Sequence, residues 1–145
     1  MNKFKSDLIF GKKYEKAFLN IINAKDFKIM EGNFKEYDLE VYNNNKITKY
    51  EIKSDRLTTK TGNICIEYRS YGKDSGISTS ESDYYGYFEV IDSDNHILYL
   101  IPTNIIKDCI KDKKYIRTMK GVDNYKSEFY LFKKNLFDKY IYEDK

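Results

Sequence analysis

Two runs of alternating residues, with three asparagines between them, constrain the fold of this chain more than any other feature. The runs cover residues 37–42 and 47–53, and Asn43, Asn44 and Asn45 separate them. Alternation of apolar and polar residues is typical of a strand with one buried face, and asparagine tolerates the positive φ angles of a tight turn. The sequence therefore predicts an antiparallel hairpin with a two-residue turn at Asn44-Asn45, which pairs residue 42 with 47, 40 with 49 and 38 with 51.

The segment before the hairpin predicts an amphipathic helix over residues 6–24. Leu8, Phe18, Ile21 and Ile22 recur at helical spacing on one face. Ser6 is of the type that caps a helix N-terminus. We therefore expect this helix to pack its apolar face on the sheet that contains the hairpin.

The remaining chain predicts mostly strands, with a helix over residues 102–111 and a short helix at the C-terminus. Residues 71–80 are rich in Gly and Ser and are expected to form a loop, and a short helical turn is expected before the strand at 87–91. The expected fold class is α/β, a mixed β-sheet flanked by helices in a single domain of residues 1–145. Strands are expected at 27–31, 63–69, 87–91, 97–101, 115–119 and 128–132.

The polar face of the hairpin carries an unusual pair of acids. In the expected register Glu40 faces Lys49, which is an ordinary cross-strand pair, but Asp38 faces Glu51. Two carboxylates in this arrangement repel each other unless solvent screens them or a cation lies between them. Lys53 falls on the same face as Glu51, because side chains alternate along a strand.

A divalent metal ion gives this group of residues a chemical use. Mg²⁺ prefers oxygen ligands, keeps several waters and is typically held by one or two carboxylates together with a substrate phosphate. Asp38 and Glu51 would hold the ion, with the carbonyl of Ile52 as a further ligand. Lys53 would place positive charge where negative charge develops in the transition state of phosphate hydrolysis.

Asp38, a gap of twelve residues and then Glu51-Ile52-Lys53 resemble the signature of the PD-(D/E)XK nucleases, with Tyr37 in the loosely kept proline position. The resemblance implies a restriction-endonuclease-like core and a metal-dependent DNA endonuclease that uses Mg²⁺, for which Mn²⁺ substitutes. It also implies a homodimer. Gly11 and Glu15 resemble the G-x-x-x-E element of many members, so Glu15 would be a further catalytic acid that helps to hold the metal.

Residues 61–84 are similar to small phage-type members of this family, in which a strand glutamate and a loop of Ser, Gly and Thr follow the core motif. Glu67 matches the strand acid and would be an accessory residue at the metal. The loop would approach the DNA backbone. The candidates for DNA binding are Ser75, Ser78 and Thr79 in this loop, and Arg56 and Lys60 after the motif.

Simpler interpretations of the same residues remain open. Asp38, Glu51 and Lys53 are also compatible with a solvated sheet face, and Glu15 and Glu67 with ordinary surface acids. The loop at 71–80 is compatible with a plain connection. Two alternatives to a general DNA endonuclease are a structure-specific Holliday-junction resolvase and a catalytically silent nucleic-acid-binding domain of the same fold.

Composition excludes other classes of enzyme and sets the expected location. His96 is the only histidine, which argues against serine and cysteine hydrolases that need an imidazole base. Cys65 and Cys109 match no zinc or redox spacing. The chain has no apolar run of membrane-spanning length and no signal-peptide pattern, so we expect a cytoplasmic protein without membrane association. A net charge of +3 does not by itself indicate a nucleic-acid partner.

Overall fold

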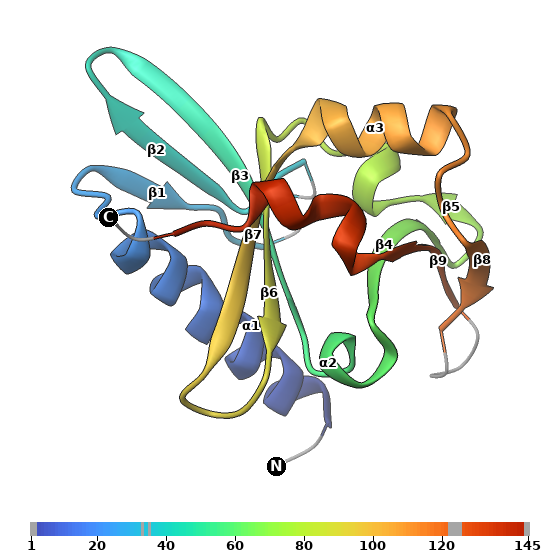
Figure 1. The fold of residues 1–145 in the computed structure, drawn as a ribbon. Coiled ribbons are helices and arrows are strands. Elements are labelled where there is room, and N and C mark those ends of the chain that lie inside the picture. Colours follow the sequence, from blue (N-terminus) through green and yellow to red (C-terminus); the bar gives the residue numbers. More distant parts are fainter. Residues whose placement is uncertain (1–2, 33, 35, 122–125, 144–145) are drawn as a thin grey trace.

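Two β-sheets and three α-helices form the molecule, in a computed structural model that describes residues 3–32, 34, 36–121 and 126–143 (Figure 1). The first sheet has five strands in the order β1 (Phe27–Ile29), β2 (Leu39–Asn43), β3 (Lys46–Asp55), β6 (Tyr84–Val90) and β7 (His96–Pro102). β3 and β6 are parallel, and the other neighbouring strands are antiparallel. The fold is therefore the mixed α/β class that the sequence predicts.

The second sheet is antiparallel and has four strands, in the order β5 (Lys73–Asp74), β4 (Asn63–Ser70), β9 (Ser127–Lys133) and β8 (Arg117–Lys120). The sequence predicts β4 and β9, but it does not predict that they belong to a sheet of their own. α2 (Thr58–Thr61) connects the two sheets between β3 and β4, and Gly62 ends it with a φ of 74°.

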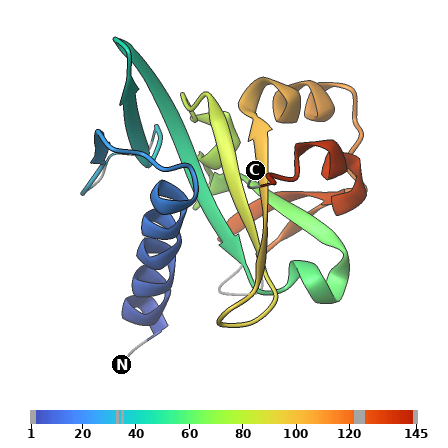
Figure 2. The same ribbon diagram turned by 60° about the vertical axis from the view of Figure 1, so that its left-hand side comes forward.

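Helix α1 (Lys3–Ile21) lies on the face of the first sheet that is turned away from the second sheet (Figure 2). Phe18 is fully buried there together with Leu39, Ile52 and Phe88. The opposite face packs against the second sheet, α3 (Thr103–Lys111) and the 3₁₀ helix η2 (Lys134–Tyr140). This second core contains the following buried residues: Ile64, Ile66, Tyr85, Tyr87, Tyr99, Ile101, Ile106, Phe132 and Phe137.

The predicted hairpin is confirmed through most of its length. Tyr42 pairs with Ile47 and Glu40 with Lys49, and the turn residues Asn44 and Asn45 have φ angles of 49° and 67°. The expected pairing of residues 38 and 51 is wrong, because the paired ladder ends at Leu39. The backbone N–H of residue 38 instead donates to the carbonyl of residue 50 at 2.9 Å.

The expected start of the first helix is also wrong, and so is one residue of its expected apolar face. Helical structure already includes Lys3, so Ser6 lies inside α1 and is not its N-cap. Of the expected apolar face, Phe18, Ile21 and Ile22 do pack into the core against the sheet, with Tyr14 beside them, but Leu8 is 49% exposed. The helix ends at Ile21, and Asn23 follows it with a φ of 57° that α-helix does not allow.

Residues 81–91 contain the remaining local error. The structure describes all of them and shows no helical turn there, and β6 begins at Tyr84 because it pairs in parallel with β3 from that residue on. The hydroxyls of Ser80, Ser82 and Thr103 form a buried hydrogen-bonded chain before the strand. The loop expected at 71–80 contains β5 and the short 3₁₀ helix η1 (Gly76–Ser78).

Within the described residues, no helix is both long enough and apolar enough to cross a membrane.

Candidate active site

A pocket of about 300 Å³, called the acidic pocket below, lies where β3 of the first sheet faces β4 of the second. Both predicted motif acids and the motif lysine line it, together with the predicted accessory acid from β4. Its lining residues are Phe34, Asp38, Glu51, Lys53, Glu67, Ser70, Ser75, Gly76 and Thr79. Phe34 and Ser70 were not predicted, because an uncharged residue gives no sign in the sequence that it lines such a pocket.

Glu51 and Lys53 enter the pocket from β3, on the face opposite to the buried Ile52. The Lys53 Nζ atom lies 3.6 Å from Oε2 of Glu51, and only 6% of Glu51 is exposed. The Lys53 side chain is 42% exposed and lines the pocket. Partial burial away from water acts to lower the pKa of Lys53. The negative charges of Glu51, Asp38 and Glu67 outweigh this effect and raise the pKa above its ordinary value.

Asp38 reaches the pocket from the position just before the first residue of β2. Its Oδ2 atom accepts a hydrogen bond of 2.7 Å from the backbone N–H of Ile52. The N–H and C=O groups of a strand residue point to the same side of the strand. The Ile52 carbonyl therefore faces the gap before the first residue of β2, beside the Asp38 carboxylate. A carbonyl that binds a metal held by Asp38 would face the same way.

Glu51 is the most perturbed acid of the pocket. Burial first, and the nearby Asp38 carboxylate as well, raise its pKa from 4.5 to about 8, although Lys53 acts in the opposite direction. Glu15 on α1 has its pKa raised to about 7, by burial and then by the charge of Asp38. Glu15 does not line the pocket, but it lies close enough for Asp38 and Lys53 to act on it.

The raised pKa of Glu51 gives a pH dependence that can be measured on the metal-free protein. Between pH 4.5 and about 8 the folded chain holds a proton on Glu51 that the unfolded chain has lost, so stability falls as pH rises through this window. Thermal unfolding in EDTA from pH 7.5 to 8.5, above the raised pKa of Glu15, should show a slope of up to about 1.4 kcal/mol per pH unit. Glu51→Gln should flatten it, and an unchanged slope in this variant would contradict the assignment.

The predicted accessory acid Glu67 is held by the loop that follows β4. Ser75 Oγ donates to Glu67 Oε2 at 2.9 Å. Gly76 has a φ of 53°, and a Cβ atom there would overlap the Glu67 carbonyl oxygen. Only glycine therefore lets the loop approach β4 closely enough to close the pocket.

Replacement of Gly76 by alanine should separate the loop from β4. We expect Gly76→Ala to lower the free energy of unfolding by at least about 2 kcal/mol, from left-handed strain and the backbone clash. Gly72→Ala is the matched control, because Gly72 has a φ of 75° but an added Cβ atom would meet nothing within 4 Å among the described residues. It should cost only about 1 kcal/mol. Equal losses in urea titrations would show that the close approach does not matter.

The candidate DNA-binding residues of the loop divide into two groups. Ser75 and Thr79 line the acidic pocket. Ser78 does not, since its hydroxyl donates to the Tyr68 carbonyl at 2.8 Å. The structure thus brings two of the three loop residues to the motif acids.

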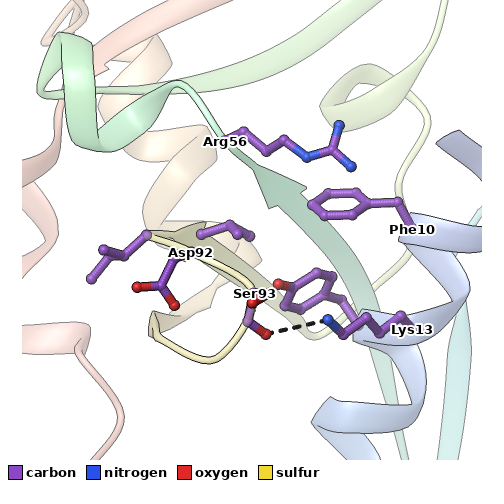
Figure 3. A pocket seen from close by; sticks show the side chains of 8 residues that line it. Phe10, Lys13, Arg56, Asp92 and Ser93 are labelled. Carbon is purple, nitrogen blue, oxygen red and sulfur yellow. Dashed lines mark hydrogen bonds between the residues drawn. The ribbon is translucent and has the colours of Figure 1, made fainter. Parts of the chain in front are cut away.

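Arg56 lies away from the acidic pocket, in a separate pocket between α1 and the turn after β6 (Figure 3). Its guanidinium carbon lies 3.6 Å from the ring centroid of Phe10. Lys13 lines the same pocket and donates to the Ser93 carbonyl at 3.4 Å. Lys60 is exposed on α2 and lines neither pocket.

The donor chemistry of the acidic pocket fits a hard divalent cation. Asp38 and Glu51 supply carboxylates that raise each other's energy when both are charged, and Ile52 supplies a carbonyl on the same side as Asp38. No cluster of three or more His, Cys, Asp or Glu side chains in metal-binding geometry occurs among the described residues. Two carboxylates with a carbonyl and water are the ligands typical of Mg²⁺ rather than of zinc.

Comparisons of the chain with protein-family models, with curated proteins and with solved structures found no match.

Proposed function

We propose that the protein is a Mg²⁺-dependent endonuclease that hydrolyses phosphodiester bonds in DNA. The observation that carries the proposal is the convergence of Asp38, Glu51 and Lys53 in one pocket. These three residues form the motif that resembles the PD-(D/E)XK nucleases. A solvated sheet face would leave the acids in water, yet Glu51 is 6% exposed and lies beside a second carboxylate and a lysine.

In the proposed site Asp38, Glu51 and the Ile52 carbonyl would hold the metal, and Glu15 on α1 would help to hold the ion or its waters. The bound ion would supply Lewis-acid polarisation of the phosphate and favour deprotonation of water. The oxygen of a water molecule forms a bond to phosphorus, and that water gives up one proton. The bond between phosphorus and the leaving sugar oxygen breaks, and this oxygen takes up a proton. Lys53 donates to the attacking water or to a phosphate oxygen and stabilises the negative charge that develops there.

DNA would lie across the mouth of the acidic pocket. Lys53 is exposed enough to meet a phosphate, and Ser75 and Thr79 lie beside it. Arg56 and Lys60 would contact the backbone farther along, because basic side chains off the reaction centre position DNA without reading its sequence. The homodimer that the resemblance implies would bring two such pockets to two strands.

Cleavage of a labelled DNA panel tests this proposal. The panel contains single strand, duplex, flap and four-way junction, each incubated with Mg²⁺, with Mn²⁺ and with EDTA. Cutting should require the metal, and Mn²⁺ should replace Mg²⁺. Preference for the four-way junction would assign the resolvase subclass. DNA binding without cleavage under any metal would refute the enzyme and favour a silent binding domain.

A further inference from the structure

Tyr85 lies beside the acidic pocket and has no role in the proposed reaction so far. In the parallel pairing of β3 with β6, Tyr85 is the partner of Glu51 and Tyr87 the partner of Lys53. Paired strand residues project to the same face of a sheet. The tyrosine ring therefore stands next to the Glu51 side chain, on the face of the first sheet that packs against the second sheet.

The hydroxyl of Tyr85 is the unusual feature. The residue is 1% exposed, and its hydroxyl is a buried side-chain polar atom without a hydrogen-bond partner in the described part of the chain. The Ser80 hydroxyl is near enough to influence it, but not in hydrogen-bond geometry. Burial, followed by the charge of Glu51, raises the pKa of Tyr85, so the hydroxyl stays a proton donor.

An unpaired buried hydroxyl costs the fold free energy that phenylalanine would not cost. The neighbouring Tyr87 shows the usual solution on the same strand and face. Its hydroxyl donates to Asp55 at 2.7 Å and accepts from the Cys65 N–H at 3.2 Å. Tyr85 lacks such partners among the described residues, although the carboxylates of Glu51, Asp38 and Glu67 are all close enough to act on it.

We propose that Tyr85 is a positioning residue whose hydroxyl donates a hydrogen bond to the Glu51 carboxylate when a divalent cation is bound in the acidic pocket. A carboxylate that binds a metal through one oxygen keeps acceptor capacity for a second partner, and such partners fix the orientation of the ligand. Glu51 is 6% exposed, so a neighbouring side chain is well placed to be that partner. This inference rests on the proposed metal-dependent function and assigns a further residue to the same site.

Tyr85→Phe and Tyr87→Phe form a matched pair that tests the inference. In EDTA, Tyr85→Phe should leave the melting temperature of the full chain unchanged or raise it, because it removes an unpaired hydroxyl. Tyr87→Phe should lower the melting temperature, because Asp55 and the Cys65 N–H lose a partner. Calorimetric titration with Mn²⁺ without DNA should then show about tenfold weaker binding for Tyr85→Phe, and unchanged binding for Tyr87→Phe.

Kinetics separate positioning from a structural role. For Tyr85→Phe the Mg²⁺ concentration for half-maximal cleavage should rise about tenfold, while KM for DNA stays constant and saturating Mg²⁺ restores most of kcat. Wild-type metal affinity in Tyr85→Phe would overturn this inference and leave the proposed function intact. Wild-type protein that binds neither Mn²⁺ nor Mg²⁺ would overturn both. Metal binding that depends on Tyr85 in a protein that cuts nothing would overturn only the nuclease.

Discussion

Lys53→Ala should lower kcat for DNA cleavage by about 10²- to 10³-fold, while the variant stays folded and still binds Mg²⁺. The reason is that Lys53 is the lysine that lines the acidic pocket, with its ammonium group 3.6 Å from the Glu51 carboxylate. Loss of one preorganised donor to the transition state costs about this much in other hydrolases. Single-turnover cleavage at saturating Mg²⁺ is the measurement, because it isolates the chemical step from product release.

Lys49→Ala is the matched control for this prediction. Lys49 projects from the same face of β3, but its Nζ atom lies 5.0 Å from the centroid of the Tyr37 ring and outside the acidic pocket. The two variants lose the same charge from the same strand. Equal loss of cleavage in both would reduce Lys53 to a general electrostatic contribution and contradict its assigned role.

Lys134→Met should have the largest effect on stability, a loss of about 3 kcal/mol at pH 7 or roughly 10 °C in melting temperature. Lys134 Nζ lies 2.9 Å from the carboxylate of Glu89, which is 1% exposed. Thr59 and Tyr99 also donate to this carboxylate, at 2.7 and 3.1 Å. Without the ammonium group a buried charge keeps only two neutral donors. The contacts of Glu89 with Thr59, Tyr99 and Lys134 join α2, β7 and η2. Loss of these contacts should also loosen the packing of the two sheets.

Two further variants sharpen that prediction. Lys133→Met removes a neighbouring exposed lysine and should change the free energy of unfolding by less than about 0.5 kcal/mol. Glu89→Gln in the Lys134→Met background removes the stranded charge and should recover part of the loss. If Lys134→Met and Lys133→Met unfold at the same denaturant concentration, the buried pair contributes nothing to stability.

The parts of the fold that sequence could predict are those set by neighbouring residues. The β2–β3 hairpin follows from alternation and from asparagines that accept positive φ, and α3 follows from Pro102 and the periodic apolar residues after it. The second sheet depends on the pairing of β4 with β9, which are separated by more than fifty residues. No local pattern in the chain contains that pairing. The true start of β6 likewise depends on its parallel neighbour β3.

The site was predictable where one strand carried it. Glu51 and Lys53 share a face through simple alternation, and Asp38 reaches them even though the expected 38–51 pair does not form. The contribution of Glu67 requires β4 to lie opposite β3 in another sheet, and sequence suggested it only through the resemblance. Tyr85 could not be found, since a buried tyrosine in an apolar strand looks like core until its partner strand and its unpaired hydroxyl are known.

The most direct measurement of the central claim is a metal chase. Wild-type protein and Asp38→Asn are incubated with labelled four-way junction and duplex in EDTA, and excess Mg²⁺ is then added while product is followed in time. Wild type should bind without cutting and begin to cut when Mg²⁺ arrives, and Asp38→Asn should bind and stay inactive. Bound DNA that remains intact in the wild type after Mg²⁺ or Mn²⁺ would contradict a metal-dependent nuclease, as would cutting that continues in EDTA.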